Sequence, residues 1–160
     1  MTPLEVAVTQ IGKKEDPTGS NWGTDAHPEV RNYLKSVGIT FPASWCMAFV
    51  YWCHVQALVD GLHLFNALKK TGGVLDQWHS VDPKLKVEPI NFLSPFNPLP
   101  GDIFIMDHGH GLGHTGFVEF VDQHGVHTIE GNSNNDGSRN GNEVVRHLRQ
   151  STQFIGLIRI

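Results

Sequence analysis

TGFVEFVDQHGVHTIE, residues 115–130, consists of two apolar runs joined by a short polar segment. The polar segment, Asp122-Gln123-His124-Gly125, has the composition of a tight turn. The runs on either side, Thr115–Val121 and Val126–Glu130, are rich in β-branched and aromatic residues, which predicts an antiparallel hairpin. Working outward from it, we expect further strands over Asp102–Asp107, Asn142–Arg149 and Phe154–Ile160.

The residues before this hairpin have helical patterns. Thr2-Pro3-Leu4-Glu5 has the form of a capping box, and the helix it begins should end at Gly12. Further helices are predicted from Pro28 to Gly38, over about Trp45–Val59 and, more weakly, over Leu64–Lys70, with an irregular connector over Asp82–Pro100. Helices followed by antiparallel strands predict an α+β fold, and the length suits one domain over residues 1–160.

The composition is that of a soluble globular protein, with 39% hydrophobic and 18% charged residues. A formal charge of -4 gives no reason to expect nucleic acid as a partner. No apolar run reaches the roughly 18 residues of a membrane span. The first residues lack the basic and apolar parts of a secretory signal. If this is the native start, we expect synthesis in the cytoplasm and no export by the general secretory route.

The two cysteines need separate explanations. On one helix Cys46 and Cys53 would lie about 10 Å apart, beyond the reach of a disulfide. Ser44 is a natural N-cap, which places Cys46 in the first helical turn, where free N–H groups and the helix dipole favour a nucleophilic thiolate. The alternative for Cys46 is a small core residue. Cys53, in mid-helix, is best explained by core packing.

A nucleophilic cysteine also needs a base and a group that orients the base. His114 begins a predicted strand, and Glu130 follows across the hairpin. A strand period of two puts Glu130 and Asn132 on the same face, where they could orient an imidazole and bind substrate or an oxyanion. Taken alone, this pair would be read as a solvated strand end.

Four segments in this order resemble the CHAP (cysteine, histidine-dependent amidohydrolase/peptidase) family, which is related to papain. They are WCMAFV (residues 45–50), PGDI (100–103), GHTGFV (113–118) and IEGN (129–132). The resemblance implies a papain-like fold, with N-terminal helices packed on a C-terminal antiparallel sheet. It also implies hydrolysis of an amide bond in the peptidoglycan stem peptide, through a thioester and without a cofactor.

By this resemblance each site residue receives a role. Cys46 attacks the amide, His114 is the base and later the acid, Glu130 orients His114, and Asn132 completes the site. Some phage members carry an Asp-rich calcium loop before the cysteine. Asn21–Ala43 offers only Asp25 and Glu29 as acidic ligands, so we expect no structural calcium.

Two alternatives remain open. His108, His110 and His114 have a spacing that could bind zinc, which would make the protein a zinc hydrolase. The chain could also be a non-catalytic module that binds the cell wall. Both leave the cysteine without a chemical role.

Aromatic and basic residues supply candidate contacts to substrate. Trp45 is expected in the core and the wall of the cleft, where it could contact substrate, and Trp22 and Trp78 are candidates for groove contacts. Three arginines could meet substrate carboxylates, although solvated surface is the better expectation for them: Arg139, Arg146 and Arg149.

The expected partner is peptidoglycan, with an immunity or delivery protein as a further candidate, and we expect a monomer. A missing signal peptide would imply delivery to the periplasm or wall by phage lysis or by a secretion system. The sequence does not distinguish between the amide that joins glycan to L-Ala and a bond inside the stem peptide.

Overall fold

The structure, a computed structural model, describes residues 1–59, 66–89, 96–133 and 141–160. Within these residues the helices are α1 (Pro3–Thr9), α2 (Glu29–Ser36), α3 (Cys46–Val59) and α4 (Val74–Ser80), with short 3-10 helices at Pro83–Leu85 and Ser151–Gln153. The strands are β1 (Lys86–Val87), β2 (Ile103–Gly109), β3 (Leu112–Asp122), β4 (Gly125–Ser133), β5 (Glu143–Arg149) and β6 (Gly156–Ile158).

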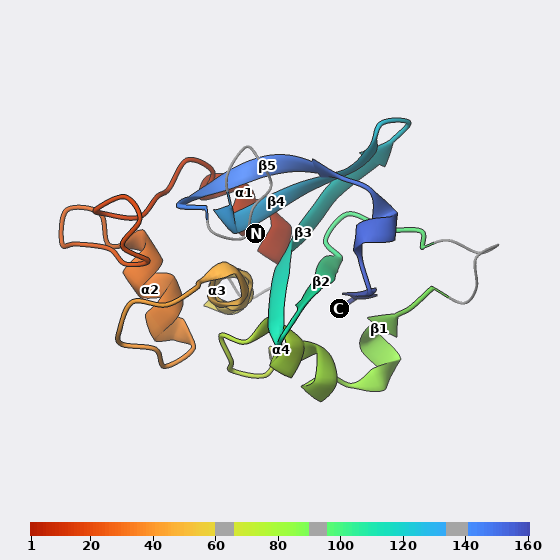
Figure 1. The fold of residues 1–160 in the computed structure, drawn as a ribbon, viewed down its shortest axis with the longest axis horizontal. Coiled ribbons are helices and arrows are strands. Elements are labelled where there is room, and N and C mark those ends of the chain that lie inside the picture. The colour runs from red at the N-terminus through yellow and green to blue at the C-terminus, as the bar shows by residue number, and fades with distance from the viewer. Residues whose placement is uncertain (60–65, 90–95, 134–140) are drawn as a thin grey trace.

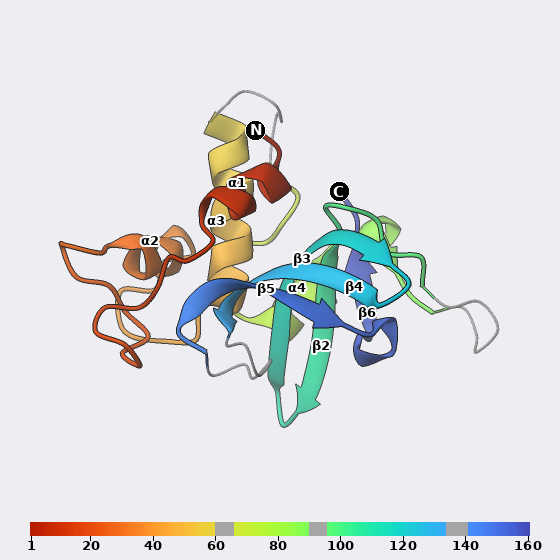
Figure 2. The same ribbon diagram turned by 90° about the horizontal axis from the view of Figure 1, so that it is seen from above.

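The strands form one antiparallel sheet in the order β1-β6-β2-β3-β4-β5. β6 therefore lies between β1 and β2, although it follows every other strand in the chain. Figure 2 shows β6 beside β2. The predicted hairpin is confirmed, because Asp122 pairs with Gly125 where β3 turns into β4. The α+β prediction is also confirmed.

α3 is the central helix of the fold. It contacts α1, α2, β3 and β4, and Figure 1 shows it between α2 and the sheet. The larger hydrophobic core joins the helices to one face of the sheet, with Phe49 of α3 packed edge-on against Phe117 of β3. A smaller core around Phe104 and Phe154 lies apart from it. This packing of a central helix on an antiparallel sheet is papain-like, as the resemblance implied.

A glycine allows β4 to approach α3 closely. A Cβ atom on Gly131 would lie 2.7 Å from Cζ3 of Trp45 and 2.9 Å from Cβ of Phe49. Any larger side chain would force the strand away from the helix. Gly131 thus brings the strand that carries Glu130 against the beginning of α3.

Some local predictions were wrong. α3 begins at Cys46, so Trp45 and not Ser44 precedes the helix. Residues 66–70 are not helical, because the Asn66 side chain accepts a hydrogen bond from the Leu68 amide and turns the chain (3.0 Å); residues 64 and 65 lie outside the described ranges. The sequence did not predict α4 or the short β1, which lies in the expected connector.

No helix in the four described ranges is both long enough and apolar enough to cross a bilayer.

Candidate active site

Cys46 is the first residue of α3 and is only 3% exposed. The first hydrogen bond of the helix runs from the Phe49 amide to the Trp45 carbonyl (2.9 Å). The amide groups of residues 46–48 therefore have no partner within the helix, and they surround the Cys46 side chain with partial positive charge. This is the environment that the sequence predicted for a nucleophilic thiol.

His114 lies in β3 and is fully buried. Its Nε2 is 2.7 Å from Oε2 of Glu130. Nδ1 is buried and makes no hydrogen bond of good geometry to any described residue. Burial alone would lower the pKa of His114, but the neighbouring Cys46 and Glu130 side chains raise it to about 9. The ring therefore favours the protonated state beside Cys46.

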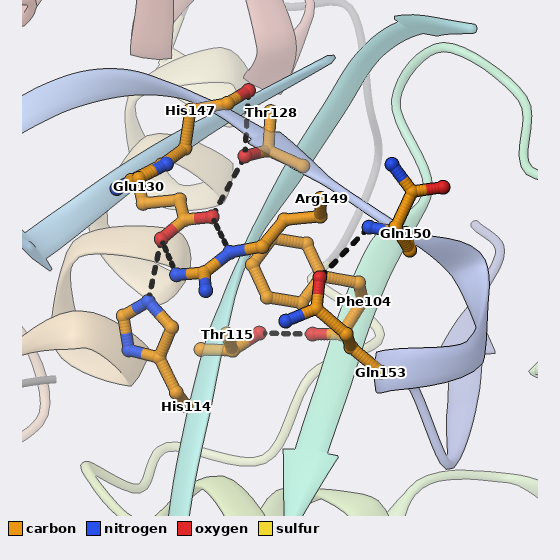
Figure 3. Close-up of polar contacts among 9 residues, drawn as sticks. All are labelled: Phe104, His114, Thr115, Thr128, Glu130, His147, Arg149, Gln150 and Gln153. Atoms are coloured by element: carbon orange, nitrogen blue, oxygen red, sulfur yellow. Dashed lines mark hydrogen bonds and ion pairs between the residues drawn. The ribbon is translucent and has the colours of Figure 1, made fainter. Parts of the chain in front are cut away.

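Glu130 of β4 accepts hydrogen bonds at both carboxylate oxygens (Figure 3). Oε1 accepts from Nε of Arg149 and the Thr128 hydroxyl, each at 2.7 Å, while Oε2 accepts from Nη2 of Arg149 at 2.6 Å and faces His114. Burial would raise the pKa of Glu130, but Arg149 and His114 hold it well below its ordinary value. Glu130 is therefore an ionised, firmly oriented partner for the imidazole. The expected contact with His114 is present, while its catalytic role stays a prediction.

Asn132 lies where the β4–β5 register is irregular, between Glu130 and Ser133. Its backbone is left-handed, with φ of 56°, a conformation that asparagine tolerates better than most residues. The residue is 1% exposed, and its Oδ1 has no hydrogen-bond partner among the described residues. The regular alternation of side chains along β4, on which the predicted shared face of Glu130 and Asn132 depends, is therefore interrupted. The Asn132 carboxamide keeps an acceptor oxygen that no described residue uses.

The predicted aromatic contacts have different surroundings. Trp45 is completely buried and donates from Nε1 to Oε1 of Glu15 at 2.9 Å, so its ring offers no surface to a substrate in this conformation. Trp22 is partly exposed and packs against the larger core, which leaves some surface for a groove contact. Trp78 is 6% exposed and belongs to that core, so burial is the better explanation for it.

The three histidines of the zinc alternative do not converge. His114 is buried against Glu130, whereas His108 and His110 are exposed at the turn between β2 and β3. Among the described residues, no three His, Cys, Asp or Glu side chains lie close enough together to hold a metal ion. This geometry gives the zinc hydrolase no support.

Arg149 was wrongly expected on the solvated surface. Its side chain is 6% exposed and forms a two-pronged ion pair with Glu130, whereas Arg146 is exposed and pairs with Glu119; Arg139 lies outside the described residues. One feature of the sequence could have distinguished the environment of Arg149 from that of Arg146. Residues three apart on a strand lie on opposite faces, so Arg146 and Arg149 could not share one environment.

A family model for the CHAP domain matches residues 37–132, which include Cys46, His114, Glu130 and Asn132. No curated protein matches the chain. No solved structure matches it either. CHAP domains indicate an amidase or peptidase of the peptidoglycan-hydrolase type, which acts on the cell wall. Since the match covers more than half of the 160 residues, this chain belongs to the CHAP domain family.

Proposed function

We propose that the protein is a cysteine hydrolase that cuts an amide bond of the peptidoglycan stem peptide through a thioester. The observation that carries the proposal is the buried His114 ring. Its Nε2 faces Glu130 at 2.7 Å, and it lies near enough to Cys46 for the two to interact electrostatically. A thiol, an imidazole and a carboxylate in this order are the parts that thiol acyl transfer requires.

The proposed reaction has two halves. The Cys46 thiolate attacks the carbonyl carbon, and the amides at the beginning of α3 stabilise the oxyanion that forms. As the C–N bond breaks, the His114 imidazolium gives its proton to the leaving amine, and the acyl group remains on sulfur. Neutral His114 then takes a proton from water, hydroxide attacks the thioester, and the carboxylic acid leaves while the thiolate is restored.

Glu130 and Asn132 have supporting roles in this proposal. Glu130 fixes the orientation of the imidazole and stabilises its charged form. The free Oδ1 of Asn132 is available to accept a hydrogen bond from a substrate amide. We also retain the partly exposed Trp22 as a proposed contact to substrate. We also propose that the chain forms one catalytic domain, because β5 and β6, which lie beyond the matched residues 37–132, complete the same sheet.

The test is digestion of purified sacculi followed by mass spectrometry of the released fragments. New muramoyl ends without peptide would identify an amidase, and new amino and carboxyl ends within the peptide would identify an endopeptidase. Cys46→Ala serves as the matched control. Sacculi left intact by the folded wild-type protein, or cut equally by both proteins, would contradict the proposal.

A further inference from the structure

The Arg149–Glu130 ion pair is enclosed in the interior of the protein. The side chains of Arg149 and Glu130 are 6% and 0% exposed, and two parallel hydrogen bonds of 2.7 and 2.6 Å join them. Arg149 comes from β5, beyond the residues that the CHAP model matches. Figure 3 shows its guanidinium and the His114 ring next to each other, both facing the Glu130 carboxylate.

A buried pair of this kind needs an explanation. Removing two charges from water is costly, and such pairs are often no more stable than apolar residues of the same volume. The geometry suggests a role in the site. Arginine keeps its charge at every working pH, and its planar fork fixes a carboxylate in one plane. Thr128 adds a third donor to the same carboxylate (2.7 Å).

The need for a fixed charge follows from the proposed reaction. His114 alternates between imidazolium and neutral imidazole, so Glu130 loses its cationic neighbour once in each cycle. A buried carboxylate without a counter-charge would take up a proton or turn toward another donor. We infer that Arg149 is a positioning residue that keeps Glu130 ionised and aimed at His114 in both protonation states of the ring. This inference rests on the proposed function.

A second consequence concerns proton delivery. Paired with Arg149, Glu130 forms a unit of no net charge, which orients the imidazolium without binding its proton too tightly. Within the part of the chain that the structure describes, the titratable or charged groups that act on His114 are Cys46 from α3, Glu130 from β4 and, through Glu130, Arg149 from β5. Removing the positive charge of Arg149 leaves Glu130 more negative toward the ring, so the imidazolium should release its proton at higher pH.

The experiment compares Arg149→Met and Arg149→Lys with Arg146→Met. Arg146 is a matched control, because it lies on the same strand and makes a bidentate pair with Glu119, but its side chain is 56% exposed. We expect Arg149→Met to lose roughly 10- to 100-fold in the rate of sacculus clearing, the scale of a misplaced catalytic group. Arg149→Lys should recover part of this loss, and Arg146→Met should match the wild type.

The second readout does not depend on peptidoglycan. The rate at which iodoacetamide modifies Cys46, followed by peptide mass spectrometry, reports the thiolate–imidazolium pair as a function of pH. Its alkaline inflection, where His114 loses its proton, should move to higher pH in Arg149→Met and stay in place in Arg149→Lys and Arg146→Met. A shifted inflection without sacculus cleavage in the wild type would refute the proposed substrate while supporting the role of Arg149.

A double variant covers the case in which Arg149→Met fails to fold. Glu130→Gln/Arg149→Met removes both charges, which avoids an uncompensated charge in the interior. Because Arg149 acts through Glu130, the double variant should cleave sacculi within about threefold of Glu130→Gln alone, as coupled residues do not add. A larger further loss, or a folded Arg149→Met with wild-type rate or inflection, would overturn the inference.

Discussion

Each of the four residue types Cys, His, Glu and Arg in the candidate site also occurs elsewhere in the chain, and a second set chosen from these residues has different surroundings. We call Cys46, His114, Glu130 and Arg149 the site set, and Cys53, His110, Glu119 and Arg146 the reference set. In the site set, His114 interacts with both Cys46 and Glu130, and Glu130 pairs with Arg149 in the interior. The reference set is scattered over α3, the β2–β3 turn, β3 and β5.

The comparison shows how position gives ordinary side chains different properties. Cys53 is in the middle of α3, where burial raises the pKa of its thiol well above the ordinary value. The Arg146–Glu119 pair has nearly the same bidentate geometry as Arg149–Glu130 but lies at the surface, where ion pairs contribute little. The same residue types are therefore expected to matter for chemistry in one set and for packing or solubility in the other.

The largest difference should separate the two cysteines. Cys46→Ala removes the proposed nucleophile and should abolish sacculus clearing while leaving the circular dichroism spectrum unchanged. Cys53→Ala should keep most activity and lower the free energy of unfolding by about 1 kcal/mol, because it leaves a small gap in the core. Equal clearing by wild type and Cys46→Ala would end the nucleophile hypothesis.

The next difference should separate the histidines. His114→Ala should lose at least about a hundredfold in initial clearing rate, the lower end for general acid–base catalysis. His110→Ala and His108→Ala, which alter exposed residues at the β2–β3 turn, should stay within roughly tenfold of wild type. Incubation with EDTA should leave all rates unchanged. If either turn variant is as damaged as His114→Ala, or if zinc restores a rate lost to EDTA, the assignment of a single base is wrong.

A smaller difference is expected between the glutamates. Glu130→Gln keeps a polar partner for His114 but removes the charge that supports the imidazolium, so its rate should fall between those of wild type and His114→Ala. Glu119→Gln breaks only the surface pair with Arg146 and should clear sacculi at the wild-type rate. The measurement is the initial clearing rate of folded variants. Similar losses of clearing rate in Glu130→Gln and Glu119→Gln would contradict the expectation that only the buried pair supports activity.

The smallest effect should appear in the acid dependence of stability. The pKa of Glu130 lies well below its ordinary value of 4.5, so the folded state binds fewer protons than the unfolded state in acid. The stability from Glu130 is then fully present above pH 4.5 and is lost as pH falls toward the folded pKa. Urea unfolding between about pH 5 and pH 2 should show a loss on the order of 1–2 kcal/mol that Glu130→Gln lacks. Glu119→Gln should keep the wild-type dependence of the free energy of unfolding on pH. If Glu130→Gln shows the same dependence as the wild type, the buried ion pairing of Glu130 is contradicted.

Patterns with strong local causes were predictable from the sequence. The β3–β4 turn followed from Asp122 to Gly125, and the long helix followed from the apolar residues after Cys46. The contact of His114 with Glu130 follows from the hairpin, because the two strands that it joins are neighbours in the sheet.

Features that depend on distant parts of the chain were not predictable in the same way. The burial of Arg149 depends on the pairing of β5 with β4, which no local pattern specifies. β1 is two residues long and exists because β6 lies beside it. The buried indole N–H of Trp45 donates to Glu15, which comes from a loop 30 residues earlier.

The place of β6 has a consequence for biosynthesis. A chain emerging from the ribosome presents Cys46, His114 and Glu130 before it presents Arg149 of β5, and β6 follows later still. Until β6 emerges, β1 and β2 lack the strand that lies between them, and until β5 emerges Glu130 lacks its counter-charge. The order of translation thus delays assembly of the site, so a nascent chain that stops before β5 carries the thiol and the imidazole without the support proposed for their reaction.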